Sequence, residues 1–161
     1  MPVLALADAI LLFPPRGVLM GLDLGTKTIG VAASDPARHV ALPVETILRR
    51  RFSEDARRVC DLATERGAVG YVLGLPINMN GSEGPRAQAT RAFARNFEKL
   101  TPLPLIFWDE RLSTAAVERA LIEADASRAK RAAVIDQHAA AYILQGALDR
   151  MTLSASGRPA D

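Results

Sequence analysis

Three acidic residues occupy positions from which they could act together on a phosphodiester bond. Asp23 ends an apolar run at 18–23, Glu110 follows a second run at 105–108, and Asp136 lies near the start of a long helical pattern. At one edge of a shared sheet such carboxylates would repel each other unless a cation lay between them. Carboxylate oxygens with positions left for water and phosphate suit Mg²⁺ or Mn²⁺. Two such ions, roughly 3.5–4 Å apart, can activate a water and stabilise the leaving oxygen.

Each of these acids also has an ordinary structural explanation. Asp23 could stabilise the turn that follows it, and Glu110 could be a solvated surface charge. Asp136 could complement the positive end of a helix dipole. Spacing alone does not show that the three carboxylates converge, so a shared metal site is a hypothesis that depends on the fold.

The apolar periodicity predicts the elements that would position these acids. Strands are predicted at residues 18–23, 28–34, 40–48, 69–73 and 105–108. Helices are predicted at about 52–66, 85–100, 114–124 and 131–150, with Ser53 capping the first of them. The order β-β-β-α-β-α-β-α-α indicates an α/β fold: a five-stranded mixed sheet flanked by helices, in which the first three strands are antiparallel and the later ones parallel.

Length and composition narrow the class of protein. A chain of 161 residues favours one domain, and a net charge of +2 excludes a histone-like basic protein but not a nucleic-acid partner. The single Cys60 excludes an intramolecular disulfide and fits the reducing cytoplasm. The apolar run that ends at Phe13 is shorter than the roughly 20 residues of a membrane span and lacks the basic start of a secretory signal. We therefore expect a cytoplasmic protein without a membrane anchor.

The same patterns divide the chain into three parts. Residues 1–17 are expected to form an N-terminal extension with a short helix that packs on the domain, stopped by Pro14 and Pro15. Residues 18–150 are expected to form the functional domain, and residues 151–161 a disordered tail.

Four blocks of the sequence carry a family resemblance. They are GLDLGTKTIGVAASD at 21–35, GLPINMNGSEG at 74–84, DERLST at 109–114 and IDQHAAAYILQ at 135–145. In this order, within residues 18–150, the blocks resemble the YqgF (RuvX) family of pre-16S rRNA nucleases, also known as Holliday junction resolvases. The resemblance implies a ribonuclease H-like fold and a nuclease that uses divalent metal. It places the family's catalytic and metal-binding acids at Asp23, Glu110 and Asp136.

The resemblance also implies a biological role. The expected reaction is endonucleolytic processing of the 5′ end of pre-16S rRNA during ribosome biogenesis. Cleavage of branched DNA at Holliday junctions is the alternative within the same chemistry. Structured RNA, branched DNA or a pre-ribosomal particle would be the partner, and the protein is expected to be a monomer or a homodimer.

Polar and basic residues near the acids are candidates for contacts with the nucleic-acid backbone. The turn after Asp23 offers N–H groups and a cation, and the glycine-containing loop at 78–84 allows a strand to approach closely. Guanidinium and ammonium groups suit phosphate. The candidates are Thr26, Lys27, Asn80, Arg111, Arg128, Lys130 and Arg131. Hairpin, salt-bridge and solvent-facing roles are equally compatible with the sequence; in particular, Arg111 could instead orient Asp109 or Glu110.

Two other functions remain open from the sequence. The segment 23–27 also resembles the first phosphate loop of the actin and sugar-kinase ATPases, although the length leaves little room for the second lobe that those enzymes need. A catalytically silent RNA-binding factor is the other possibility, which the presence of all three motif acids disfavours.

Overall fold

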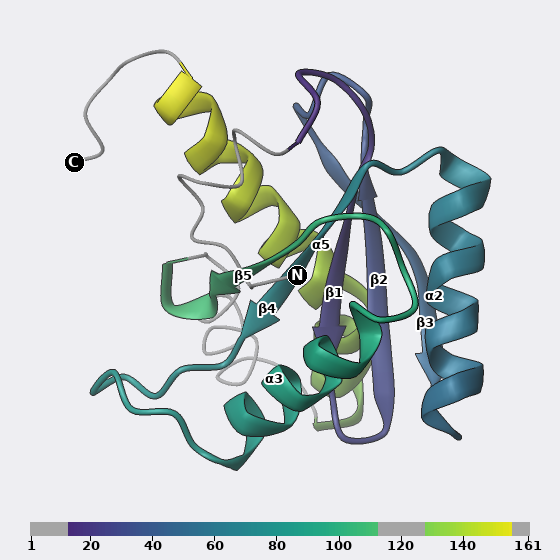
Figure 1. The fold of residues 1–161 in the computed structure, drawn as a ribbon. Helices are drawn as coiled ribbons and strands as arrows, with labels where there is room; N and C mark the ends of the chain where they lie inside the picture. Colours follow the sequence, from purple (N-terminus) through teal and green to yellow (C-terminus); the bar gives the residue numbers. More distant parts are fainter. Residues whose placement is uncertain (1–12, 113–127, 156–161) are drawn as a thin grey trace.

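The protein is represented by a computed structural model that describes residues 13–112 and 128–155 (Figure 1). For residues 128–137 and 153–155 it describes the backbone alone. The helices predicted within residues 1–13 and at 114–124 fall on segments outside this description.

A five-stranded mixed sheet forms the centre of the molecule. The strands are β1 (Leu19–Leu24), β2 (Thr28–Ser34), β3 (Ala41–Leu48), β4 (Gly70–Leu75) and β5 (Leu105–Asp109). Their order across the sheet is β3-β2-β1-β4-β5. The β1–β2 and β2–β3 pairs are antiparallel, whereas β1–β4 and β4–β5 are parallel, which confirms the predicted arrangement. The carboxyl ends of β1, β4 and β5 therefore share one edge, at the lower left of Figure 1.

Helices cover both faces of this sheet. The helices α2 (Phe52–Arg66) and α3 (Pro85–Phe97) contribute to a core on one face, whereas α5 (Arg128–Ala155) crosses the other face (Figure 1). The alternation of side chains along β1 divides its residues between the two cores. The α2/α3 core includes Met20, Leu22, Leu24, Val59, Phe93 and Phe97. The α5 core includes Leu19, Val72, Ile106, Trp108, Ile143 and Leu144.

The helices differ from those predicted at three points. Helix α2 begins at Phe52, so Ser53 lies inside its first turn and the predicted Ser53 cap is wrong. The carboxylate of Asp55 instead accepts a hydrogen bond from the Arg50 backbone N–H at 3.1 Å. Helix α3 ends at Phe97, and the 3₁₀ helix η1 (Glu110–Leu112) follows β5. Helix α5 continues to Ala155, so residues 151–155, expected in the tail, belong to the helix.

Helix α5 lies directly against the backbone of β1. A Cβ atom at Gly21 would come within 2.7 Å of the Leu144 Cβ and 3.0 Å of the Ala140 carbonyl oxygen. These contacts involve a backbone carbonyl and a Cβ atom attached directly to the backbone, neither of which can rotate away. Gly21 therefore fixes how closely α5 packs on the centre of the sheet.

We predict that Gly21→Ala destabilises the fold by forcing α5 off β1. Overpacking of this kind costs roughly 1–3 kcal/mol, and each kcal/mol lowers the melting temperature by about 2–4 °C in a domain of this size. Thermal unfolding followed by circular dichroism measures the effect. The matched control is Gly84→Ala, whose Cβ would make only ordinary contact with the Asn78 side chain at 3.6 Å. Equal melting temperatures for the two variants would contradict the prediction.

Candidate active site

Asp23 lies at the carboxyl end of β1, on the face covered by α5. Leu19 belongs to the α5 core and Gly21 contacts α5, so alternation places the Asp23 side chain on that same face. Pairing of Leu22 with Leu73 puts Asp23 beside Gly74 of β4, and its antiparallel partner on β2 is Gly30. Asp23 therefore has a glycine beside it on each neighbouring strand.

Glu110 approaches the same space from the other side of β4. It follows β5 directly, and only 7% of its surface is exposed. A Cβ atom at Gly74 would lie 3.3 Å from the Glu110 Cδ and 2.5 Å from the Ile143 Cδ1. The missing side chain of Gly74 thus leaves a cradle in which the Glu110 carboxylate lies over β4, on the face covered by α5.

The third predicted acid, Asp136, lies in α5. Followed from its carboxyl end toward its amino end, α5 runs toward the sheet edge that carries the acids (Figure 1). It passes from Met151 in the core to Ala140 beside Gly21. Residue 136 is one helical turn further along this direction. The Asp136 side chain is outside the described part, so its convergence with Asp23 and Glu110 remains a prediction.

The donors at this edge fit a hard divalent cation. The Glu110 carboxylate lies in the Gly74 cradle and Asp23 lies on the neighbouring strand β1, and carboxylate oxygens are the ligands that Mg²⁺ and Mn²⁺ prefer. Among the side chains that the structure describes, no three His, Cys, Asp or Glu residues form a metal cluster. A complete centre of three acids therefore requires Asp136.

Arg111 is held by Asp109 beside the site. Its Nη2 donates to Asp109 Oδ2 at 2.7 Å, and its backbone N–H donates to Oδ1 at 2.9 Å. The Arg111 guanidinium holds the pKa of the Asp109 carboxyl below its ordinary value, and the pKa of Arg111 is raised in turn. The pair fixes the corner at which the chain leaves β5 and turns into η1 at Glu110.

The loop that carries Asn80 is ordered by its own polar side chains. Asn80 Oδ1 accepts hydrogen bonds from the Ser82 backbone N–H at 3.0 Å and from the Ser82 hydroxyl at 2.6 Å. Gly81 has a φ of 87°, which favours glycine, and a Cβ there would lie 3.7 Å from Arg111 Nη1. The loop therefore lies beside the Arg111 guanidinium with Asn80 exposed.

The remaining predicted contacts divide into two groups. Thr26 and Lys27 are exposed in the turn between β1 and β2, at the edge that carries Asp23. Arg128, Lys130 and Arg131 lie in the first turns of α5, where side chains are outside the described part.

Two arginines at this edge were not predicted as site residues. Arg49 and Arg86 line a hollow of about 50 Å³ together with residues of the β1–β2 turn. The run of three arginines at 49–51 was a visible signal in the sequence. Nothing in the sequence pointed to Arg86, because its neighbour Leu24 is 62 positions away.

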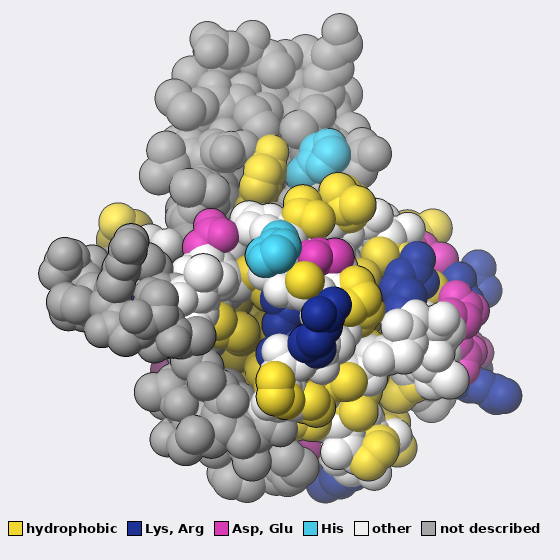
Figure 2. Space-filling model, turned by 90° about the horizontal axis from the view of Figure 1, so that it is seen from above, with side chains coloured by type: hydrophobic (Ala, Val, Ile, Leu, Met, Phe, Trp, Pro, Cys, Tyr) yellow, Lys and Arg dark blue, Asp and Glu magenta, His cyan; other side chains and the backbone are white. Residues whose placement is uncertain are grey.

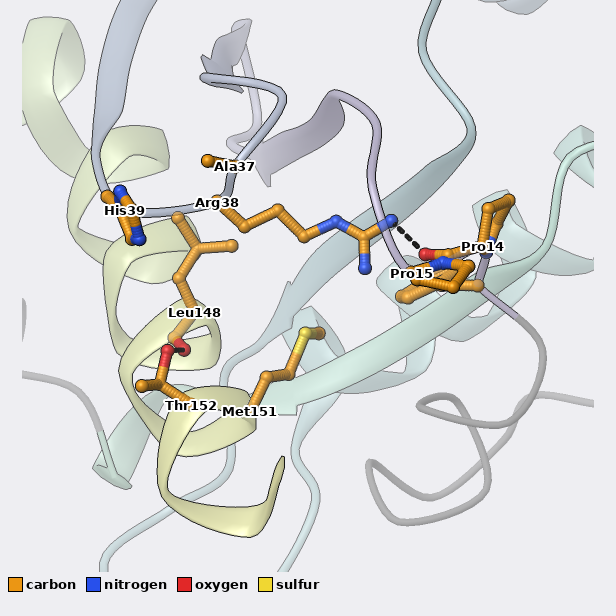
Figure 3. A pocket seen from close by; sticks show the side chains of 9 residues that line it. Pro14, Pro15, Ala37, Arg38, His39, Leu148, Met151 and Thr152 are labelled. Atoms are coloured by element: carbon orange, nitrogen blue, oxygen red, sulfur yellow. Dashed lines mark hydrogen bonds between the residues drawn. The ribbon is translucent and has the colours of Figure 1, made fainter. Parts of the chain in front are cut away.

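A larger cavity lies at the opposite end of the sheet. Its volume is about 390 Å³, and its lining includes Phe13, Arg38, Leu148 and Met151 (Figure 3). Arg38 Nη2 donates to the Pro14 carbonyl oxygen at 2.6 Å there. The view of this end shows hydrophobic side chains with few acids among them (Figure 2). Among the side chains that the structure describes, the lining includes none of the predicted site residues, and the cavity lies at the end of the sheet away from Asp23.

The fold and the position of the acids define a class of protein. The solved structure described as "T. thermophilus RuvC in complex with Holliday junction substrate" matches with a TM-score of 0.52 at 12% identity, over 84% of this chain and 96% of that one. The protein therefore has the ribonuclease H-like fold of the RuvC resolvases, as predicted.

Sequence comparison gives the family. The RuvX family model, described as Holliday junction resolvase, matches residues 17–150. A relative from Rhodopseudomonas palustris (strain BisA53), named "Putative pre-16S rRNA nuclease", is 69% identical over 94% of this chain and 93% of its own. A relative with the same name from Bradyrhizobium sp. (strain BTAi1) is 65% identical over 98% of both chains. The chain belongs to the RuvX (YqgF) family.

The Asp109–Arg111 pair predicts a pH dependence of stability. Because the folded pKa of Asp109 is depressed, its carboxylate stabilises the fold above the ordinary value of 3.8, and this contribution is lost as the pH falls through the folded pKa. We predict that Asp109→Asn lowers the melting temperature at neutral pH and that the difference from wild type shrinks on acidification. Asp61→Asn, on the exposed face of α2, is the control. A difference for Asp109→Asn that does not change with pH would contradict this role.

Proposed function

We propose that this protein is a divalent-metal-dependent endonuclease that processes the 5′ end of pre-16S rRNA. One observation carries the proposal: the Glu110 carboxylate lies in the cradle left by Gly74, next to the strand end that bears Asp23. Two carboxylates on neighbouring strand ends, on the same face of the sheet, suit metal-assisted phosphodiester hydrolysis. The names of the curated relatives support RNA as the substrate.

Asp23, Glu110 and Asp136 would hold the Mg²⁺ or Mn²⁺, with two ions expected. When bound, these ions make a water molecule more acidic and offset the negative charge that develops on the phosphate. The chain itself fixes the donors. Gly74 and Ile143 define where the Glu110 carboxylate lies, and the Asp109–Arg111 pair fixes the backbone from which it projects.

Binding of the substrate would extend from these acids along the sheet edge. Thr26, Lys27 and Asn80 are exposed there, and Arg111 lies beside the loop that carries Asn80. We assign to these residues, and to Arg128, Lys130 and Arg131 of α5, contacts that position the nucleic-acid backbone.

The proposed setting is the cytoplasm, with a pre-ribosomal particle as the partner and residues 18–150 as the catalytic domain. Within the part of the chain that the structure describes, no helix is long and apolar enough to cross a membrane. The choice between monomer and homodimer stays a prediction.

Resolution of Holliday junctions is the second candidate function. The description of the matching family model favours it, and the same acids would carry out the cleavage. The ATPase alternative has less support, because the described residues form one sheet with its helices and no second lobe.

We predict that Asp23→Asn and Glu110→Gln each lower the cleavage rate by more than ~100-fold. Changing a residue that only supports a metal ligand costs roughly 10–100-fold, and losing a ligand itself should cost more. Purified protein is incubated with Mn²⁺ and either pre-16S rRNA 5′ ends or four-way DNA junctions. The control Asp61→Asn should cleave like wild type. Selective cleavage of RNA supports rRNA processing, and selective cleavage of junctions supports resolution. If wild type cuts neither substrate, or if the acid variants keep its rate, the nuclease proposal is wrong.

We predict that Gly74→Ala weakens Mn²⁺ binding by roughly 10–100-fold by displacing the Glu110 carboxylate. Isothermal titration calorimetry measures the affinity. The same change also crowds Ile143, and Ile143→Val removes the Cδ1 atom that lies 2.5 Å from the new Cβ. The double variant Gly74→Ala/Ile143→Val should therefore recover melting temperature without recovering Mn²⁺ affinity. If the double variant recovers both its melting temperature and its Mn²⁺ affinity, Gly74 is needed only for helix packing and not to position Glu110.

A further inference from the structure

We propose that Arg49 and Arg86, with Thr26, form a binding site for one backbone phosphate of the substrate strand. This site rests on the proposed nuclease function, and it adds a second anchor away from the cleaved bond. It lies at the same sheet edge as the catalytic acids but opens on the opposite face, under α3.

Three segments that are distant in sequence build the site. Arg49 follows β3, Arg86 lies in the first turn of α3, and Thr26 lies in the β1–β2 turn; all three line one hollow of about 50 Å³. Arg49 Nη1 donates to the Gly25 carbonyl oxygen at 2.6 Å. Arg86 Nη2 lies 3.5 Å from the Leu24 carbonyl oxygen. Two successive carbonyls therefore hold the two guanidinium groups at the same hollow.

Within the described part of the chain, no acid forms an ion pair with either of these two arginines. Arg91 and Arg111, which also lie near this edge, are each paired side-on with a carboxylate, at 2.9 Å to Glu83 and 2.7 Å to Asp109. The guanidiniums of Arg49 and Arg86 each have five N–H donors and use one in the contacts above, so both keep donors and charge for an anion.

The position of the hollow fits a strand that passes over the catalytic edge. Leu24 and Phe93 line it and belong to the α2/α3 core, whereas the neighbouring Asp23 faces α5. The exposed residues Thr26 and Lys27 lie between the two faces. A strand cleaved at Asp23 could thus cross the turn and place a neighbouring phosphate between the arginines.

The size of the hollow limits what can enter it. A volume of about 50 Å³ admits one small group rather than a base or a peptide. A phosphate between two guanidiniums gains charge-assisted hydrogen bonds from both sides. Contacts of this kind fix the register of a bound strand without reading its sequence.

The test measures the binding of a fluorescein-labelled single-stranded RNA by anisotropy, in EDTA and over a series of KCl concentrations. On a single strand, the slope of log affinity against log salt changes by about 0.7 for each phosphate that the protein neutralises. We expect Arg49→Gln/Arg86→Gln to bind roughly 10-fold more weakly or worse. The magnitude of its slope should be smaller than that of wild type by about 0.7, because both arginines hold one phosphate.

Two further variants separate binding from structure. Arg57→Gln/Arg95→Gln removes the same charge from exposed positions on α2 and α3 and should leave the slope unchanged. Arg49→Lys/Arg86→Lys keeps the charge and should recover most of the slope. If the arginines only brace the carbonyls of Leu24 and Gly25, both the Gln and the Lys variants will unfold at a lower temperature while the slope stays at the wild-type value.

The outcomes are distinguishable from failure of the nuclease proposal. If Arg49→Gln/Arg86→Gln has the same affinity and salt slope as the Arg57→Gln/Arg95→Gln control, the phosphate site is overturned. Cleavage by the wild-type protein would still support the nuclease proposal. A slope change of about 1.4, equivalent to two phosphates, also overturns the single site. The site is likewise overturned if the wild-type protein binds neither the RNA nor DNA of the same sequence. Wild-type binding with the expected slope change but without cleavage in Mn²⁺ supports the site and contradicts the nuclease.

Discussion

The close packing of α5 on two glycines of the sheet, Gly21 and Gly74, is the constraint on which the rest of the structure depends. Gly21 lets the helix approach the backbone of β1, and Gly74 leaves a cradle on the next strand. The same helix residue, Ile143, borders that cradle, so helix packing and the position of Glu110 are set together. A bulkier residue at either glycine would move α5 relative to the sheet edge that carries the acids. The fold and the candidate site are therefore parts of one packing arrangement.

Charge is distributed around that edge in a way that the net charge of +2 conceals. On the α5 face, Asp23 and Glu110 place two carboxylates at the ends of β1 and β5. Near β5 and α3, the pairs of Asp109 with Arg111 and Glu83 with Arg91 balance their own charges. Under α3, Arg49 and Arg86 contact backbone carbonyls and keep their positive charge. An almost neutral chain is thus compatible with the proposed cation site and the proposed phosphate site, both acting on one polyanionic strand.

The sequence predicted all five strands and their order along the chain because each is a short segment rich in apolar residues and bounded by turn residues. Helix ends were harder to predict, since they depend on tertiary contacts. Asp55 stabilises the start of α2 in place of Ser53, and burial of Met151 in the α5 core accompanies the extension of that helix beyond residue 150. Strand ends were enough to propose Asp23 and Glu110. The cradle at Gly74 and the partnership of Arg49 with Arg86 depend on strand register and helix placement, which sequence spacing does not contain.

The central claim is that Asp23 and Glu110 share a metal ion above Gly74, on the face covered by α5. A crystal structure of the protein soaked in Mn²⁺, with data collected at the manganese absorption edge, tests it most directly. We expect an anomalous peak bonded to carboxylate oxygens of both Asp23 and Glu110, with Asp136 completing the site. A peak that contacts only one of these two acids, or carboxylates too far apart to bind the same centre, would contradict the claim.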